Sequence, residues 1–153
     1  MADKHSKQVR SYNMSKIRAK DTKPEMTVRK FLHSNGFRYR LNSKKLIGKP
    51  DIVLPKYKTV IFIHGCFWHG HMNCKYFTIP ETRTEWWLNK IDINKKHDAK
   101  VIQSLLSQNW RVIIIWTCEL KAKTKQAKLA ALLDEIRKPS TSPEKYWDNN
   151  TLL

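Results

Sequence analysis

Residues 110–116, with the sequence WRVIIIW, form an almost continuous apolar run. A strand that is apolar along its whole length is covered on both faces, so this run predicts a central strand of a buried sheet. Two further strand patterns precede it, DIVLP at 51–55 and TVIFIH at 59–64, and the turn-like KYK separates them. The chain therefore needs a sheet with cover on both of its sides.

A helix and a short strand are predicted before these strands. Residues 21–36 have a helical pattern in which Pro24 follows Thr22 or Lys23 at the first turn and Gly36 ends the helix. Residues 37–42, FRYRLN, alternate as a half-buried strand does.

Two more helical stretches lie on either side of the central strand. Residues 80–110 begin with a capping-box pattern, Thr82 with Glu85, and residues 119–138 are amphipathic. The order helix, strand, strand, strand, helix, strand, helix predicts an α/β fold with a mixed β-sheet flanked by helices. We expect residues 1–20 to form a basic arm, 21–138 the main domain, and 139–153 a loosely ordered tail.

The charge of the chain is strongly unbalanced, with 30 Lys and Arg against 13 Asp and Glu, a formal net charge of +17. Such an imbalance is most simply explained by a polyanionic partner, although a generically basic, soluble surface is the alternative. Nucleic acid is favoured over a membrane because neither terminus carries a basic amphipathic helix with a continuous apolar face. With no membrane-length apolar run and no signal-like N-terminus, we expect a cytoplasmic protein.

The chain has an odd number of cysteines, Cys66, Cys74 and Cys118, which argues against a disulfide framework in a cytosolic protein. Cys66-x4-His71-x2-Cys74, with Cys118 just after the central strand, predicts a Cys3His zinc site. His69 could replace His71 as the ligand. The alternative is three buried free cysteines with surface histidines. Four protein ligands leave no open position, so the zinc would be structural.

Acidic residues are scarce in the basic first half, and two of them stand out. Asp51 opens a strand at a sheet edge, where its carboxylate could hold Mg²⁺ with a phosphate oxygen, although Pro-Asp is often only a turn. Glu25 could equally be a favourable charge at a helix N-terminus. His64 and His69 lie near this edge, and one of them could deprotonate a water, or both could be supporting or solvent-facing groups.

Five segments in the same order carry a resemblance to a known family: RSYNMSKIRAKDT, KPD, HGCFWHGH, TRTEWWLNKI and WRVIIIW-x-C. Together the segments resemble the very-short-patch-repair (Vsr) DNA mismatch endonucleases, over most of the chain. The resemblance implies a restriction-endonuclease-like fold. It also implies a Mg²⁺-dependent nick 5′ of the thymine in a T:G mismatch. Such mismatches arise by deamination of 5-methylcytosine, and the nick initiates repair.

The resemblance also implies catalytic roles. Asp51 matches a Mg²⁺-binding aspartate, and His69 matches the general base, with His64 and Glu25 as supporting residues. Position 63 is expected to offer its backbone carbonyl to Mg²⁺. It is Ile63 here, where the best-known pattern has threonine, and the Glu-x-Lys of most nucleases of this fold is absent.

The remaining roles concern zinc and DNA. The zinc ligands would be Cys66, His71, Cys74 and Cys118, with one extra residue in the loop before Cys74. Phe67, Trp68 and Trp87 would form an aromatic wedge that enters the base stack beside the mismatch. Met14, Lys90 and Asn94 match mismatch-contacting positions, and Trp86 is expected in the core. The zinc would then stiffen the loop that carries the wedge.

Two other functions remain open. The chain could be a non-catalytic, zinc-containing sensor of distorted DNA, a reading that Ile63 favours, or a related endonuclease that cuts matched sequence. The expected partners are double-stranded DNA with a T:G mismatch and possible repair-pathway proteins. We expect a monomer because a single mismatch has no two-fold symmetry for a dimer to match.

Overall fold

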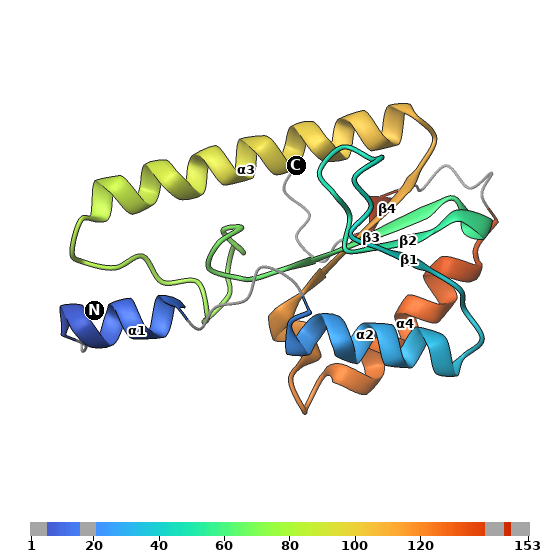
Figure 1. Ribbon diagram of the computed structural model, residues 1–153, viewed down its shortest axis with the longest axis horizontal. Coiled ribbons are helices and arrows are strands. Elements are labelled where there is room, and N and C mark those ends of the chain that lie inside the picture. Colours follow the sequence, from blue (N-terminus) through green and yellow to red (C-terminus); the bar gives the residue numbers. More distant parts are fainter. Residues whose placement is uncertain (1–5, 16–20, 140–145, 148–153) are drawn as a thin grey trace.

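A mixed sheet lies between two helical layers in the computed structural model, which describes residues 6–15, 21–139 and 146–147 (Figure 1). The strands, in spatial order, are β1 (Arg40–Leu41), β2 (Ile52–Leu54), β3 (Thr59–His64), β4 (Arg111–Trp116) and β5 (Tyr146–Trp147). β1, β2 and β3 are antiparallel neighbours, whereas β4 is parallel to β3 and β5 is parallel to β4. The predicted α/β class with a mixed sheet is confirmed.

The helices are α1 (Lys7–Ser15), α2 (Lys23–Ser34), α3 (Thr84–Ser107) and α4 (Lys125–Arg137), with short 3-10 turns η1 (Pro55–Tyr57) and η2 (Thr117–Leu120). α2 and α4 cover one face of the sheet and α3 covers the other (Figure 1). Within the described part of the chain, every helix is too short or too polar to cross a bilayer. Most of the predicted tail, and residues 1–5 and 16–20 of the predicted arm, lie outside the described residues.

β2, β3 and β4 are mostly apolar because alternate side chains enter two separate cores. One core joins the sheet to α2 and α4 and includes Ile52, Leu54, Ile61, Ile113, Ile115, Leu32 and Leu132. The other joins the sheet to α3 and includes Val53, Val60, Phe62, Val112, Ile114, Ile102 and Leu105. Successive residues of a strand point to opposite faces, so a sheet with both faces covered needs no polar alternation.

Two predicted elements are shorter than their patterns. Only Arg40 and Leu41 of the segment 37–42 pair as β1, because Phe37 is buried in the core and packs against the ring of Tyr57. The last helix begins at Lys125 and not at residue 119, since the chain first forms η2 and a further turn.

The predicted start of α2 is confirmed: the Thr22 hydroxyl accepts a hydrogen bond from the backbone N–H of Glu25. The predicted capping box of Thr82 with Glu85 is wrong. α3 begins at Thr84, and the residue before it, Arg83, has a left-handed backbone with φ of 56° and makes no side-chain cap. The start of α3 is therefore set by the loop before it.

A buried arginine fixes the end of α4. The Arg111 guanidinium donates to the carbonyls of Glu135, Ile136, Lys138 and Pro139 at 2.8–3.1 Å. These are carbonyls at a helix C-terminus, where no intrahelical partner remains and a positive charge is favourable. The first residue of the central strand thus holds α4 against the sheet.

Candidate active site and metal cluster

A cavity of about 640 Å³ opens where β3 ends, between the first turn of α2 and the middle of α3. Its chemically active lining residues are Glu25, Asp51, His64, His69 and Asp98, and Trp68 also lines it. The first four come from three separate segments of the sequence and were all predicted as site residues. The structure brings them together in one cavity.

Asp51 directly precedes β2, and its side chain extends the β2–β3 hydrogen bonding. The carboxylate oxygen Oδ2 accepts a hydrogen bond of 2.7 Å from the backbone N–H of Ile63. Burial, and next the nearby charge of Glu25, raise the pKa of Asp51 to about 6, although the Ile63 N–H acts in the opposite direction. β2 has neighbours on both sides, so Asp51 lies at a strand end and not on an edge strand.

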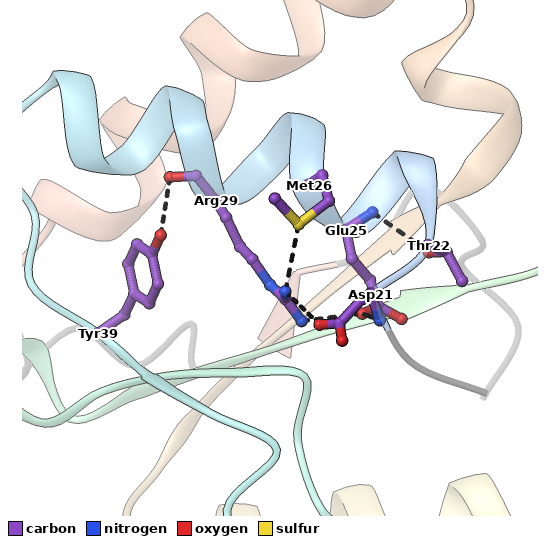
Figure 2. A network of polar contacts seen from close by, with 6 residues as sticks. All are labelled: Asp21, Thr22, Glu25, Met26, Arg29 and Tyr39. Carbon is purple, nitrogen blue, oxygen red and sulfur yellow. Dashed lines mark hydrogen bonds and ion pairs between the residues drawn. The ribbon is translucent and has the colours of Figure 1, made fainter. Parts of the chain in front are cut away.

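Glu25 is held by a buried polar network (Figure 2). The Arg29 guanidinium donates to Glu25 Oε2 at 3.0 Å and to Asp21 Oδ1 at 2.6 Å, and Glu25 Oε2 also accepts from the Asp21 backbone N–H at 2.9 Å. Only 4% of Glu25 and 5% of Arg29 are exposed. Glu25 does lie in the first turn of α2. Its hydrogen bonds also fix the carboxylate in one orientation beside the cavity. A residue that only stabilises the helix end by its charge does not need such bonds.

The two predicted histidines stack on each other. The ring centres of His64 and His69 are 3.8 Å apart and the planes are nearly parallel. His64 is buried, and burial, followed by the charge of His69, holds its pKa well below the usual range, so it is neutral at neutral pH. His69 Nδ1 lies 2.6 Å from Asp98 Oδ2.

Asp98 is the site residue that sequence reasoning missed. It lies on α3, one turn after Asn94 and two turns after Ile91, and this face of the helix packs against the loop after β3. The spacing of Asn94 and Asp98 was a usable signal once Asn94 was assigned to that face.

The predicted zinc ligands form a compact cluster. The ligand atoms of Cys66, His71, Cys74 and Cys118 all lie within 4.8 Å of one another, and the three cysteines form no disulfide. His71, and not the alternative His69, belongs to this group: its Nδ1 is 3.5 Å from Cys118 Sγ. Its ring also stacks on Trp116 at the end of β4, with centres 4.1 Å apart.

The donor atoms are close enough together to hold one metal ion. Burial, followed by the neighbouring sulfurs of Cys66 and Cys74, raises the pKa of the Cys118 thiol, so gathered thiolates are unfavourable without a cation. Three sulfurs and one imidazole nitrogen are a ligand set that structural zinc prefers. The loop reaches this geometry through left-handed backbone at Gly70 and Asn73. A Cβ at Gly70 would lie 2.8 Å from the Ile91 side chain, so only glycine fits there.

Three aromatic rings gather where the loop after β3 meets the first turn of α3. The Phe67 ring lies 5.2 Å from both Trp68 and Trp87, and those two lie 5.9 Å apart, all centre to centre. The Asn94 side-chain amide donates to the Trp68 carbonyl at 2.9 Å and so ties the loop to α3. All three rings are half-buried. The prediction that Trp86 is core is wrong: it is 46% exposed, because the first turns of α3 extend beyond the sheet (Figure 1).

Comparisons with known proteins fit this site. Residues 2–75 match the family described as DNA mismatch endonuclease Vsr. The type II nicking enzyme V.NmeAIP of Neisseria meningitidis serogroup A is 50% identical over 138 residues, which are 90% of this chain and 98% of that protein. The DNA mismatch endonuclease Vsr of Escherichia coli is 44% identical over 82% of this chain and 80% of that protein. This chain belongs to the Vsr family.

A further relative matches this chain over almost the full length of that relative. The type II nicking enzyme V.XorIIP of Xanthomonas oryzae pv. oryzae is 43% identical over 88% of this chain and 98% of that protein. Membership of the Vsr family makes this protein an endonuclease that acts on DNA, as its basic charge predicted.

Of the six residues predicted to contact DNA in this Vsr-family endonuclease, Trp68 lines the cavity and the other five do not. Met14 is exposed on α1, and Lys90 is exposed on α3, one turn before Asn94. Their roles in DNA binding stay predictions.

Proposed function

We propose that this endonuclease requires Mg²⁺ and nicks one strand 5′ of the thymine in a T:G mismatch, which initiates repair of deaminated 5-methylcytosine. The observation that carries this proposal is a single cavity in a Vsr-family protein that combines Asp51, the His69–Asp98 pair and an adjoining aromatic cluster. We also propose a restriction-endonuclease-like fold, the division into arm, nuclease domain and tail, and a monomer. Repair-pathway proteins are possible partners.

The residues at the end of β3 suit a Mg²⁺ ion. Asp51 would hold the ion together with the backbone carbonyl of Ile63. In an extended strand the N–H and C=O of one residue face the same side, and the Ile63 N–H already donates to Asp51. The isoleucine side chain therefore does not prevent this role. When bound, Mg²⁺ supplies a Lewis acid that polarises the scissile phosphate. Glu25, fixed by Arg29 in the first turn of α2, would support the ion as a further carboxylate of the cavity lining.

His69 would act as the general base. With a proton on Nδ1, His69 would donate a hydrogen bond to Asp98 Oδ2, which leaves the lone pair of Nε2 to take a proton from a water. The water oxygen would form the new bond to phosphorus, and one existing phosphorus–oxygen ester bond would break. The neutral ring of His64 supports the His69 ring from one side, so the base is fixed by a carboxylate and by a stacked ring.

The aromatic cluster suits mismatch recognition. Phe67, Trp68 and Trp87 would enter the stack beside the mismatch, which costs a few kcal/mol of unstacking. Opening a poorly stacked T:G wobble costs less than opening a matched pair, and this difference contributes selectivity. Met14, Lys90 and Asn94 would contact the mismatch. A structural zinc at Cys66, His71, Cys74 and Cys118 would fix the loop in advance.

The test is a nicking assay on end-labelled duplexes that carry either a T:G pair or a T:A pair at one position. Magnesium is added or omitted, and no chelator is used, because a chelator would also remove zinc. We expect a Mg²⁺-dependent nick beside the thymine in the mismatched duplex only. Cutting of matched DNA would select the sequence-specific endonuclease instead. Binding of DNA without any cleavage would select the sensor.

Two variants test the assigned roles in the same assay. Asp51→Asn should abolish nicking, and Asp98→Asn should slow the single-turnover rate about 10²-fold, a usual loss for a compromised general base. Both variants should bind the mismatched duplex as tightly as the native protein. Native nicking rates in either variant would remove that residue from the mechanism.

A further inference from the structure

A second groove, of about 530 Å³, lies beside the metal cluster. It is formed by the loop after the cluster and by the segment that joins η2 to α4. Three lysines, Lys75, Lys121 and Lys123, line it together with Tyr76.

The groove and the cavity differ in charge. The catalytic cavity contains the carboxylates of Glu25, Asp51 and Asp98, whereas the lining of the groove includes no acidic residue. A concave surface lined by one sign of charge focuses the field and attracts counter-ions. The groove therefore suits an anion, and the cavity suits a cation.

Tyr76 adds an aromatic surface between the charges. The ring is part of a residue that is 45% exposed, and the ammonium groups of Lys75 and Lys121 lie 5.1 and 5.2 Å from its centre. Two ammonium groups at the same ring repel each other, and a phosphate oxygen beside them would relieve that repulsion. A flat exposed ring among cations matches the alternation of phosphate with sugar and base in a nucleic acid strand.

The groove is also adjacent to the catalytic cavity. η2 borders both, with Thr117 in the lining of the cavity and Cys118 in that of the groove. Three members of the metal cluster, His71, Cys74 and Cys118, form part of the groove wall. DNA whose backbone enters the cavity thus needs to continue only past η2 to reach the lysines.

We propose that this groove binds the phosphodiester backbone of the DNA substrate beyond the nicked position, with Lys121 and Lys123 at phosphates and Tyr76 against a neighbouring sugar or base. The inference rests on the proposed binding of DNA at the catalytic cavity. It gives the groove a role in affinity and not in the choice of mismatch, because phosphate contacts carry no direct sequence information.

The experiment compares two double variants that remove the same charge. Lys121→Ala with Lys123→Ala removes two of the three lysines that line the groove. Lys56→Ala with Lys58→Ala is the matched control, because these lysines also lie against aromatic rings, Tyr57 and Trp110, but at the opposite end of β3. Fluorescence anisotropy measures binding to labelled T:G and matched duplexes over a series of NaCl concentrations, with Ca²⁺ in place of Mg²⁺ to prevent cleavage.

The groove variant should bind both duplexes about tenfold more weakly at low salt, with the ratio between them unchanged. The slope of log affinity against log salt concentration should be shallower by about two for this variant, because each lost phosphate contact reduces the slope by about 0.9. Tyr76→Leu should weaken binding without changing that slope. The control pair should change neither affinity nor slope.

A native slope in the groove variant, or an equal loss in the control pair, would overturn the inference. Circular dichroism and thermal unfolding verify that each variant is folded. Failure of the native protein to bind any duplex would instead reject the proposed function. If the groove variant binds DNA as tightly as the native protein and nicks it at the native rate, the role of the groove is rejected and the proposed function is not.

Discussion

At the scale of single residues, Asp51 shows that burying a carboxylate in the cavity costs stability. Burial raises its pKa from 3.8 to about 6, and the Glu25 carboxylate adds to this effect. An ionised carboxylate in this position is therefore unfavourable until a cation arrives. The Ile63 N–H and the Arg29 guanidinium, which both favour the charged form, offset only part of the penalty.

This penalty predicts a pH-dependent gain in stability for Asp51→Asn. As the pH rises from about 4 to about 6, Asp51 in the unfolded chain loses its proton while Asp51 in the folded protein keeps it. The free energy of unfolding of the native protein therefore falls through this window, and the amide variant avoids the loss. Well above pH 6 the variant should be more stable by about 3 kcal/mol, and near pH 4 the difference should vanish.

Urea unfolding without Mg²⁺, at several pH values, measures the difference. Both proteins carry the same cysteine cluster, so its own acid sensitivity cancels. The amide oxygen can still accept from the Ile63 N–H, so the change removes charge and little else. A difference that does not vary with pH would contradict this account of Asp51.

At the scale of elements, the loop after β3 and the start of α3 form one unit. Replacing Phe67 and Trp68 with alanine should lower the preference for a T:G duplex over a matched duplex about tenfold, because the energetic difference in unstacking is no longer used. Leu88→Ala is the control, since Leu88 is an exposed apolar residue near the start of α3. Binding competition between the two duplexes measures the ratio, and an unchanged ratio would remove the wedge from the proposal.

The long apolar strands were the elements that the sequence predicted best. β3 and β4 match their patterns almost residue for residue, because burial on both faces leaves little choice of register or bounds. β1 and the start of α3 were predicted less well. In both, tertiary contacts overrule a local pattern: Phe37 leaves the strand pattern for the core, and the turn at Arg83 replaces the expected cap.

In the candidate site, too, local patterns predicted some residues, whereas others depend on tertiary contacts. Tight local spacing predicted the gathering of Cys66, His71 and Cys74, and the strand before Cys118 brought the fourth ligand in. Asp98 was missed because its partner, His69, is 29 positions away and one carboxylate on a long, charged helix has no signature of its own. Trp86 was placed in the core because sequence does not tell how far a helix extends beyond its sheet.

At the scale of the whole molecule, the metal cluster joins the loop after β3 to the end of β4. Removing zinc with phenanthroline, in excess Mg²⁺, should lower the stability by several kcal/mol and abolish mismatch nicking. Re-addition of Zn²⁺ should restore both, and Mg²⁺ should restore neither. Cys118→Ser should behave like the chelated native protein, and the chelator should have no further effect on it.

Thermal unfolding and the nicking assay measure these changes in parallel. A chelated protein with the native unfolding temperature would show that the cluster holds no stabilising metal. Loss of nicking without loss of stability would place the metal in catalysis and not in the structure.

The same cluster has a consequence for the unfolded chain. His71 and Cys118 are 47 positions apart, and the segment between them contains all of α3 and β4. A metal that stays bound to both would close this segment into a ring, much as a disulfide does. A ring of this length removes about 4 kcal/mol of chain entropy in the usual cross-link estimate. Parallel pairing of β3 with β4 joins distant parts of the chain. With the metal bound, the ends of the β3–α3–β4 crossover would already be close together, so this pairing would cost less loop-closure entropy.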